Sequence, residues 1–134
     1  MSADKPLILC VDDDPDLLES TRLLLEEAGF AVVLAGSAMD GLSAYHLCKP
    51  DLVLVDLMME EVDAGAGFVR EIRGRGGREP ILLVSSVGEG LHRSVDWREL
   101  GLSGVLQKPV DPDVLVRTIR AKLALQAAER ASRA

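Results

Sequence analysis

Charged residues stand at or just after the ends of short apolar runs at three places in the chain. Asp12 and Asp13 follow the first such run, Asp56 ends another, and Lys108 comes just after the last. Each run has the length of a buried strand in a parallel sheet, whose final residue emerges at the carboxyl edge of the sheet. Because α/β proteins bind their ligands along that edge, the four side chains are candidates for one binding site.

Three of these four groups are carboxylates, and their mutual repulsion defines the chemistry of the site. Two like charges about 4 Å apart repel by on the order of 4 kcal/mol at an effective dielectric constant near 20. A hard divalent cation removes that repulsion, and Mg²⁺ prefers oxygen ligands, retains water and commonly joins a few carboxylates to a phosphate group. Acids without cysteine or histidine ligands nearby therefore indicate Mg²⁺.

The segments that must position these charges alternate between strand-like and helical patterns. Continuous apolar runs predict five strands, and apolar residues at helical spacing predict five helices, with Asp14 as the N-cap of the first. Right-handed crossovers then require a single α/β domain built as a three-layer sandwich. The expected strands are 7–11, 30–34, 51–56, 81–84 and 105–106, and the expected helices are 15–28, 38–48, one around 68–72, 89–101 and one from 111 onward.

Composition narrows the class of partner. The chain has 134 residues, a formal net charge of -7 and only 3% aromatic residues, a balance that disfavours direct nucleic-acid binding. Cys10 and Cys48 have no metal-knuckle or redox-pair spacing and are expected to be free thiols. The sequence shows no signal peptide and no apolar run long enough to cross a bilayer, so we expect a cytoplasmic protein that does not bind membranes.

The motifs around these charges resemble the receiver domain of two-component response regulators. The resemblance covers about residues 7 to 125, and its motif positions occur in the family's order and strand contexts. It implies a flavodoxin-like (βα)5 fold with a five-stranded parallel sheet in the order 2-1-3-4-5. The matching residues are the run 8–14 ending in three aspartates, the run 51–59 with Asp56, then Ser85 and the pair Lys108-Pro109.

The resemblance also implies a role for each residue of the site. Asp56 would accept the phosphoryl group from a histidine kinase, Lys108 would pair with the phosphoryl oxygens, and Ser85 would hydrogen-bond to the same group. Asp13, Asp56 and the backbone carbonyl of Met58 would bind Mg²⁺ directly, with Asp12 acting largely through water. The Lys108-Pro109 peptide bond would be cis.

The sequence departs from the family pattern at three places. The segment from Glu60 to Gly67 lacks the family's usual proline and gains one residue, so we expect a longer, acidic loop beside Asp56. Val105 stands where many receivers carry Tyr or Phe, so the usual aromatic switch is missing. Met58 and Val87 are apolar at positions that orient the hydrolytic water in the family, which predicts a long-lived phosphoryl group.

We divide the chain into a receiver domain, residues 1–125, and a C-terminal segment, residues 126–134. Its Ala-rich sequence predicts a helical extension that protrudes, binds a partner or begins a linker, and the alternative is a frayed, solvated end. The expected assembly is a monomer or a weak dimer.

Taken together, these features predict a signalling switch that catalyses its own phosphorylation and dephosphorylation rather than an enzyme. Its partners would be a sensor histidine kinase or phosphotransfer protein and a downstream effector protein. Two alternatives stay open: a pseudo-receiver that binds partners without being phosphorylated, and a Mg²⁺-dependent phosphatase or phosphotransferase that forms an aspartyl phosphate. The second usually needs another acid two residues after the nucleophile, where this chain has Met58.

Overall fold

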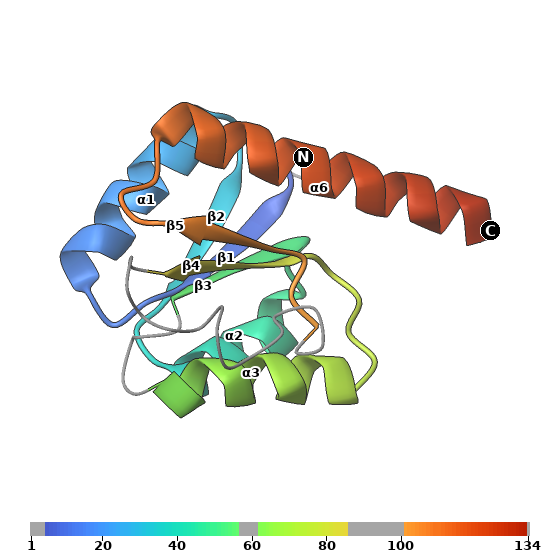
Figure 1. Ribbon diagram of the computed structural model, residues 1–134, viewed down its shortest axis with the longest axis horizontal. Helices are drawn as coiled ribbons and strands as arrows, with labels where there is room; N and C mark the ends of the chain where they lie inside the picture. The colour runs from blue at the N-terminus through green and yellow to red at the C-terminus, as the bar shows by residue number, and fades with distance from the viewer. Residues whose placement is uncertain (1–4, 57–61, 86–100, 134) are drawn as a thin grey trace.

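Five parallel strands form one sheet in the order β2-β1-β3-β4-β5 (Figure 1). The computed structural model describes residues 5–56, 62–85 and 101–133, without the side chains of residues 62–66, 85 and 133. The predicted flavodoxin-like sheet and its strand order are confirmed. The strands are β1 (Leu7–Val11), β2 (Ala31–Ala35), β3 (Leu52–Asp56), β4 (Ile81–Ser85) and β5 (Gly104–Gln107).

Helices cover both faces of this sheet and complete the three layers. In Figure 1, α1 and α6 lie over one face and α2 and α3 over the other. The helix predicted over residues 89–101 falls almost wholly outside the residues that the structure describes. The described helices are α1 (Pro15–Glu27), α2 (Ala38–Cys48), α3 (Val62–Gly74) and α6 (Pro112–Arg133).

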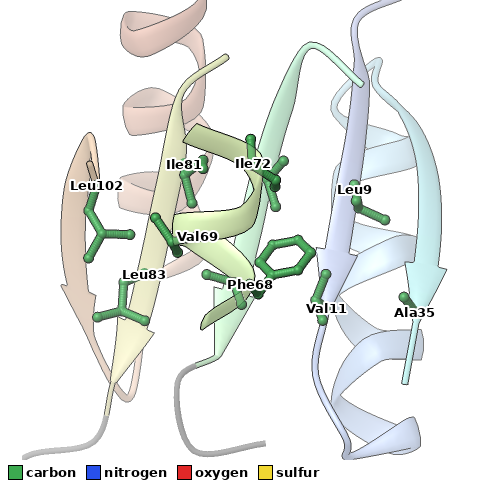
Figure 2. Packing of buried hydrophobic residues seen from close by; sticks show 11 residues of the cluster. Leu9, Val11, Ala35, Phe68, Val69, Ile72, Ile81, Leu83 and Leu102 are labelled. Carbon is green, nitrogen blue, oxygen red and sulfur yellow. The ribbon is translucent and has the colours of Figure 1, made fainter. Parts of the chain in front are cut away.

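The strands are apolar on both sides, and successive residues feed two separate core clusters. The first cluster lies under α2 and α3, where Phe68 and Ile72 face the sheet (Figure 2). The second lies under α1 and α6, which contribute buried residues such as Leu25 and Ile119. The central strand β1 shows the alternation, because Leu9 belongs to the first cluster and its neighbour Cys10 to the second.

One predicted boundary was wrong. The segment from Glu60 to Gly67 was expected to be a loop, but α3 begins at Val62. Gly65 and Gly67 each weaken a helix by roughly 1 kcal/mol relative to alanine, yet the apolar positions from Phe68 onward anchor the helix to the core. The connection after β3 is therefore shorter than predicted.

The first helix is fixed at both ends. Asp14 is its N-cap, as predicted, and accepts hydrogen bonds from the backbone N–H groups of Asp16 (3.0 Å) and Leu17 (3.3 Å). At the other end Arg120 of α6 donates a hydrogen bond from Nη2 to the carbonyl of Ala28 (2.9 Å). The same guanidinium lies 5.9 Å from the centre of the Phe30 ring, which places a cation over an aromatic face.

The last helix is longer than the sheet that it covers. Gln126 is its last buried residue, and the side chains of residues 127–132 are exposed. With 22 residues α6 spans about 33 Å at 1.5 Å per residue. Figure 1 shows its final turns running past the sheet. The domain boundary expected after residue 125 stays a prediction.

Two helical glycines should respond in opposite directions to alanine. A Cβ on Gly41 of α2 would lie 3.0 Å from both Phe68 Cε1 and Val11 Cγ2, whereas a Cβ on Gly67 of α3 would meet no atom within 4 Å. We expect Gly41→Ala to lower the free energy of unfolding by roughly 1 kcal/mol, because overpacking outweighs the gain in helix propensity. Gly67→Ala should raise it by about 0.5–1 kcal/mol. Urea denaturation of both variants tests this, and a stabilised Gly41→Ala protein would contradict it.

Candidate functional site at the carboxyl edge of the sheet

The centre of the site is an ion pair between Asp56 and Lys108. Asp56 is the last residue of β3, and Lys108 follows β5, with β4 lying between these two strands. With neighbouring strands about 4.8 Å apart, only a long side chain can cross β4. The Lys108 Nζ atom lies 2.6 Å from Asp56 Oδ2. The Lys108-Pro109 peptide bond is cis, as expected.

A second carboxylate, Asp12, lies beside this pair. It directly follows β1, the neighbour of β3, and its backbone N–H donates to the carbonyl of Ala35 (3.1 Å). Both carboxyl groups are poorly hydrated, because Asp12 is 9% exposed and Asp56 is 5% exposed. Two buried carboxylates therefore share one ammonium group.

The pKa of Asp12 is raised above its ordinary value by this arrangement. Burial is the main cause that raises the pKa of Asp12, and the nearby charges of Asp56 and Asp13 raise it further. The backbone N–H of Asp14 donates to Asp12 Oδ1 (3.0 Å) and, with the ammonium of Lys108, opposes that rise in pKa. The net effect is a raised pKa, because burial and the neighbouring carboxylates make the charged form of Asp12 less favourable than it is in water.

Of the remaining predicted site residues, the structure describes Asp13 and the backbone of Ser85 but not the others. Asp13 is exposed, in contrast to its buried neighbour Asp12. Ser85 is the final residue of β4, where its Cα pairs in register with Gln107. Met58 and Val87 lie outside the described residues. The sequence alone did not reveal which of the two adjacent acids would be buried.

The donor set suits a hard cation that keeps part of its water shell. Among the described residues, no group of three or more His, Cys, Asp and Glu side chains is arranged to hold a metal ion. Two buried carboxylates nevertheless face the same edge, and Mg²⁺ commonly binds through one or two carboxylates together with phosphate oxygens and water. Asp12 and Asp56 fit that pattern.

Replacing Asp12 by Asn should stabilise the protein at neutral pH when no divalent cation is present. The pKa of Asp12 is higher in the folded protein than its ordinary value of 3.8, which applies to the unfolded chain. The wild-type protein therefore loses stability as the pH rises from that ordinary value through the pKa of the folded state. Asn cannot ionise, still accepts the Asp14 hydrogen bond, and should raise the free energy of unfolding by on the order of 1 kcal/mol.

Chemical denaturation at several pH values in EDTA measures this effect. The advantage of Asp12→Asn should shrink as the pH falls below the ordinary aspartate range. Asp14→Asn is the matched control, because asparagine caps a helix as well as aspartate does and this exposed side chain should change little. An Asp12→Asn protein less stable than wild type at neutral pH would contradict the prediction.

Comparison with known proteins agrees with this geometry. The family model described as "Response regulator receiver domain" matches residues 8–120, which include the whole sheet except Leu7, the first residue of β1. The chain belongs to the response regulator receiver family. The matched residues include Asp12, Asp56 and Lys108 at the carboxyl edge of the sheet.

Two relatives of this receiver are longer proteins. The chain is 35% identical over 121 residues to the transcriptional regulatory protein CseB of Streptomyces coelicolor, covering 90% of this chain and 50% of CseB. It is 37% identical over 112 residues to the transcriptional regulatory protein GlrR of Escherichia coli, covering 84% of this chain and 25% of GlrR. The chain therefore spans half or less of these two relatives.

Solved structures give the same fold. A CheY-like receiver domain protein from Methanospirillum hungatei superposes with a TM-score of 0.85 at 29% identity, covering 93% of this chain and 98% of that one. A receiver domain protein from Clostridium thermocellum gives a TM-score of 0.83 at 25% identity, covering 92% and 98%. Within the part of the receiver that the structure describes, no helix has the length and apolar character needed to span a membrane.

Val105 marks this receiver's departure from the aromatic pattern. It lies in β5, is partly buried, and packs against the first core cluster. A valine has one χ1 angle and a compact side chain, so it cannot swing between an exposed and a buried position as a ring can. Any coupling between the carboxyl edge and β5 must use movements of the backbone or of other side chains.

Proposed function

We propose that this receiver accepts a phosphoryl group on Asp56 in a Mg²⁺-dependent reaction and passes the signal to a downstream effector protein. The observation that carries the proposal is the 2.6 Å contact between Lys108 Nζ and Asp56 Oδ2, with Asp12 buried next to it. A carboxylate nucleophile, an adjacent ammonium and a second carboxylate are the groups that phosphoryl transfer to aspartate needs.

The residues would divide the work as follows. An Asp56 carboxylate oxygen attacks the phosphorus atom of a phosphohistidine, the P–N bond breaks, and an acyl phosphate forms on Asp56. The Lys108 ammonium, already at the carboxylate, moves to an oxygen of the incoming phosphoryl group and neutralises part of its charge. Ser85, at the end of β4, is the proposed hydroxyl donor to another phosphoryl oxygen.

The metal would be held by carboxylates at the ends of β1 and β3. Asp12, Asp13 and Asp56 are the proposed side-chain ligands or water-mediated partners, with the Met58 carbonyl completing the protein's share. Mg²⁺ bound there supplies charge neutralisation for the transferring group and relieves the repulsion between the buried acids. No histidine or cysteine takes part.

The phosphoryl donor would be a sensor histidine kinase or a phosphotransfer protein. The output would reach an effector protein, attached or separate, since CseB and GlrR are transcriptional regulatory proteins of greater length. The net charge of -7 suits contact with a basic protein surface and opposes direct contact of this domain with nucleic acid. On this proposal the receiver is a switch that catalyses its own phosphorylation and dephosphorylation.

The deciding experiment is incubation of the protein with acetyl phosphate and Mg²⁺, followed by intact-mass analysis. We expect an adduct of one phosphoryl group per chain with Mg²⁺ and none when EDTA replaces the metal. Absence of any adduct under both conditions would favour a pseudo-receiver that only binds partners. Continuous release of phosphate without a lasting adduct would favour the phosphatase alternative.

A further inference from the structure

The strand β2 forms one free edge of the sheet. It pairs with β1 on one side and with no other strand of the described residues, and Figure 2 shows it, with Ala35 labelled, as the outermost strand beside β1. Four of its five residues are only half-buried, whereas every residue of the central strand β3 is buried. An edge strand of this kind carries backbone N–H and C=O groups that can pair with a further strand.

Hydrogen bonds to β1 show which backbone groups of β2 are already used. The Ala31 N–H donates to the carbonyl of Pro6 (2.9 Å) at one end of the strand, and the Asp12 N–H donates to the carbonyl of Ala35 (3.1 Å) at the other. In a parallel pair, every second residue directs both its N–H and its C=O toward the same neighbour. The odd-numbered residues of β2 are therefore the ones bonded to β1.

Val32 and Leu34 direct their backbone groups the other way, toward the free edge. Within the part of the chain that the structure describes, no group bonds to them from that side. The edge thus offers two N–H donors and two C=O acceptors, placed on either side of Val33. Each of these groups gains a protein partner when a further strand is added.

β2 lacks the features that usually protect an edge strand. Its sequence, Ala-Val-Val-Leu-Ala, contains no charged residue, proline or glycine. The strand at the opposite edge, β5, is one residue shorter and is followed by Lys108 and Pro109, two residue types that discourage edge pairing. Of the two edges, β2 is therefore the one suited to pairing.

The order of side chains in β2 fits a second copy of the same strand. An antiparallel copy related by a two-fold axis at Val33 would pair each residue with its mirror position in the strand. The resulting pairs are Ala31 with Ala35, Val32 with Leu34, and Val33 with its own copy. Small side chains then meet small ones and branched side chains meet branched ones. Val33 and its copy form a β-branched pair of the kind that stabilises antiparallel strands.

We propose that two copies of this receiver associate through β2, with each β2 antiparallel to the other in one continuous sheet. The outward groups of Val32 in one copy bond to those of Leu34 in the other, and the half-buried valines of both strands are shielded from water. Each copy carries a formal charge of -7 and the contact rests on one strand, so the dimer is weak and strengthens as salt screens the repulsion.

The dimer leaves both candidate phosphorylation sites open. Lys108 follows β5, at the opposite edge of the sheet from β2, and Asp56 ends the central strand β3. The antiparallel pairing also turns the two carboxyl edges in opposite directions. Each copy can therefore meet its own partner protein while the two sheets are joined.

Sedimentation equilibrium and amide hydrogen exchange together test the pairing. From micromolar to millimolar concentration, the mean mass should rise toward twice that of the monomer, and more so at higher salt. Exchange at the amides of Val32 and Leu34 should slow about tenfold once about nine in ten copies are paired, because only the free edge exchanges. Val33, already bonded to β1, should be protected at every concentration. Added protection at alternate residues of β2 is the signature of a strand joined at this edge.

Two variants of β2 and a matched control locate the contact. Val32→Pro removes an outward N–H and no bond to β1, a position where edge strands tolerate proline. Each dimer then loses two hydrogen bonds, so association should weaken about tenfold or more. Ala31→Lys, which places a charge on the edge, should do the same and serves if a melting curve shows that Val32→Pro unfolds. Ala121→Lys adds the same charge to an exposed position of α6 and should leave association unchanged.

Several outcomes would contradict pairing through β2. A monomeric mass at millimolar concentration would exclude the dimer, and protection of Val32 and Leu34 in that monomer would mean that a segment of the same chain covers the edge. Loss of association in Ala121→Lys but not in the β2 variants would place the contact on α6. These measurements involve no phosphoryl transfer, so their outcome is independent of the role proposed for Asp56.

Discussion

Replacing Asp56 by Asn should abolish the phosphoryl adduct formed with acetyl phosphate and Mg²⁺. Asn keeps the size of the side chain and one oxygen, but its amide is a poor nucleophile and cannot form the acyl phosphate. It also lacks the charge that attracts the Lys108 ammonium across β4. Intact-mass analysis under the conditions that label the wild-type protein measures the effect, which should be complete rather than partial.

The matched control is Asp51→Asn, one strand length earlier in the chain. Asp51 Oδ2 accepts a hydrogen bond from the Leu7 backbone N–H (2.7 Å) at the opposite end of the sheet, and an asparagine oxygen can accept the same bond. This variant should be phosphorylated like the wild type. An adduct of equal size on Asp56→Asn would mean that another residue is the acceptor and would refute the assignment.

Replacing Lys108 by Met should affect both phosphorylation and stability. Methionine keeps most of the apolar stem and removes the ammonium, so Asp12 and Asp56 lose the cation that both interact with. We expect the rate of phosphorylation to fall by about 10²–10³-fold, the usual effect of removing one stabilising donor from a developing anion. The free energy of unfolding without metal should fall by about 1–3 kcal/mol, less than for a fully buried pair, because Lys108 is 29% exposed.

Two further variants make this prediction specific. Lys122→Met removes a lysine of α6 that lies away from the carboxyl edge and should leave the phosphorylation rate unchanged. The double variant with Asp56→Asn should recover most of the stability that Lys108→Met loses, because the unpaired buried charge is gone. Stopped-flow or mass-based kinetics and urea denaturation provide the two measurements. A double variant no more stable than Lys108→Met alone would contradict the ion-pair explanation.

The sheet could be predicted in detail because its residues carry a strong local signal. The run 52–55 is apolar at every position, which indicates a strand covered on both faces and hence a central place in a parallel sheet. Polar residues directly after such runs then had to meet at one edge. The contact between Asp56 and Lys108 follows from that placement and from the length of the lysine side chain.

Other features depend on tertiary packing that local patterns do not encode. The start of α3 was missed because Gly65 and Gly67 weaken the local helical signal, while the contacts of Phe68 in the core decide the outcome. Helix α1 shows the same limit, because its regular apolar spacing does not show how far each leucine is buried: Leu25 is fully buried, whereas Leu17 is 38% exposed. The burial of each position depends on how closely the neighbouring layers approach, which the sequence does not state.

The two adjacent acids illustrate a third limit. Asp12 directly follows β1 and keeps the alternation of the pleat, so it shares the face of Cys10, whereas Asp13 lies one residue farther from the strand. The sequence shows this alternation but not which face the helices enclose at that level. The structure resolves the question by burying Asp12 and exposing Asp13.

The position of α6 in the chain has a consequence for biosynthesis. Strands β2, β1 and β3 lie together in the sheet and are complete once residue 56 has left the ribosome. Helix α1 covers only part of the apolar face that contains Ile8 and Leu52, and the rest of that face stays uncovered until Ile119, in the last of the described elements, arrives. The nascent chain therefore carries an exposed apolar surface through most of its translation, which makes this face the natural target for chaperones and for misassembly.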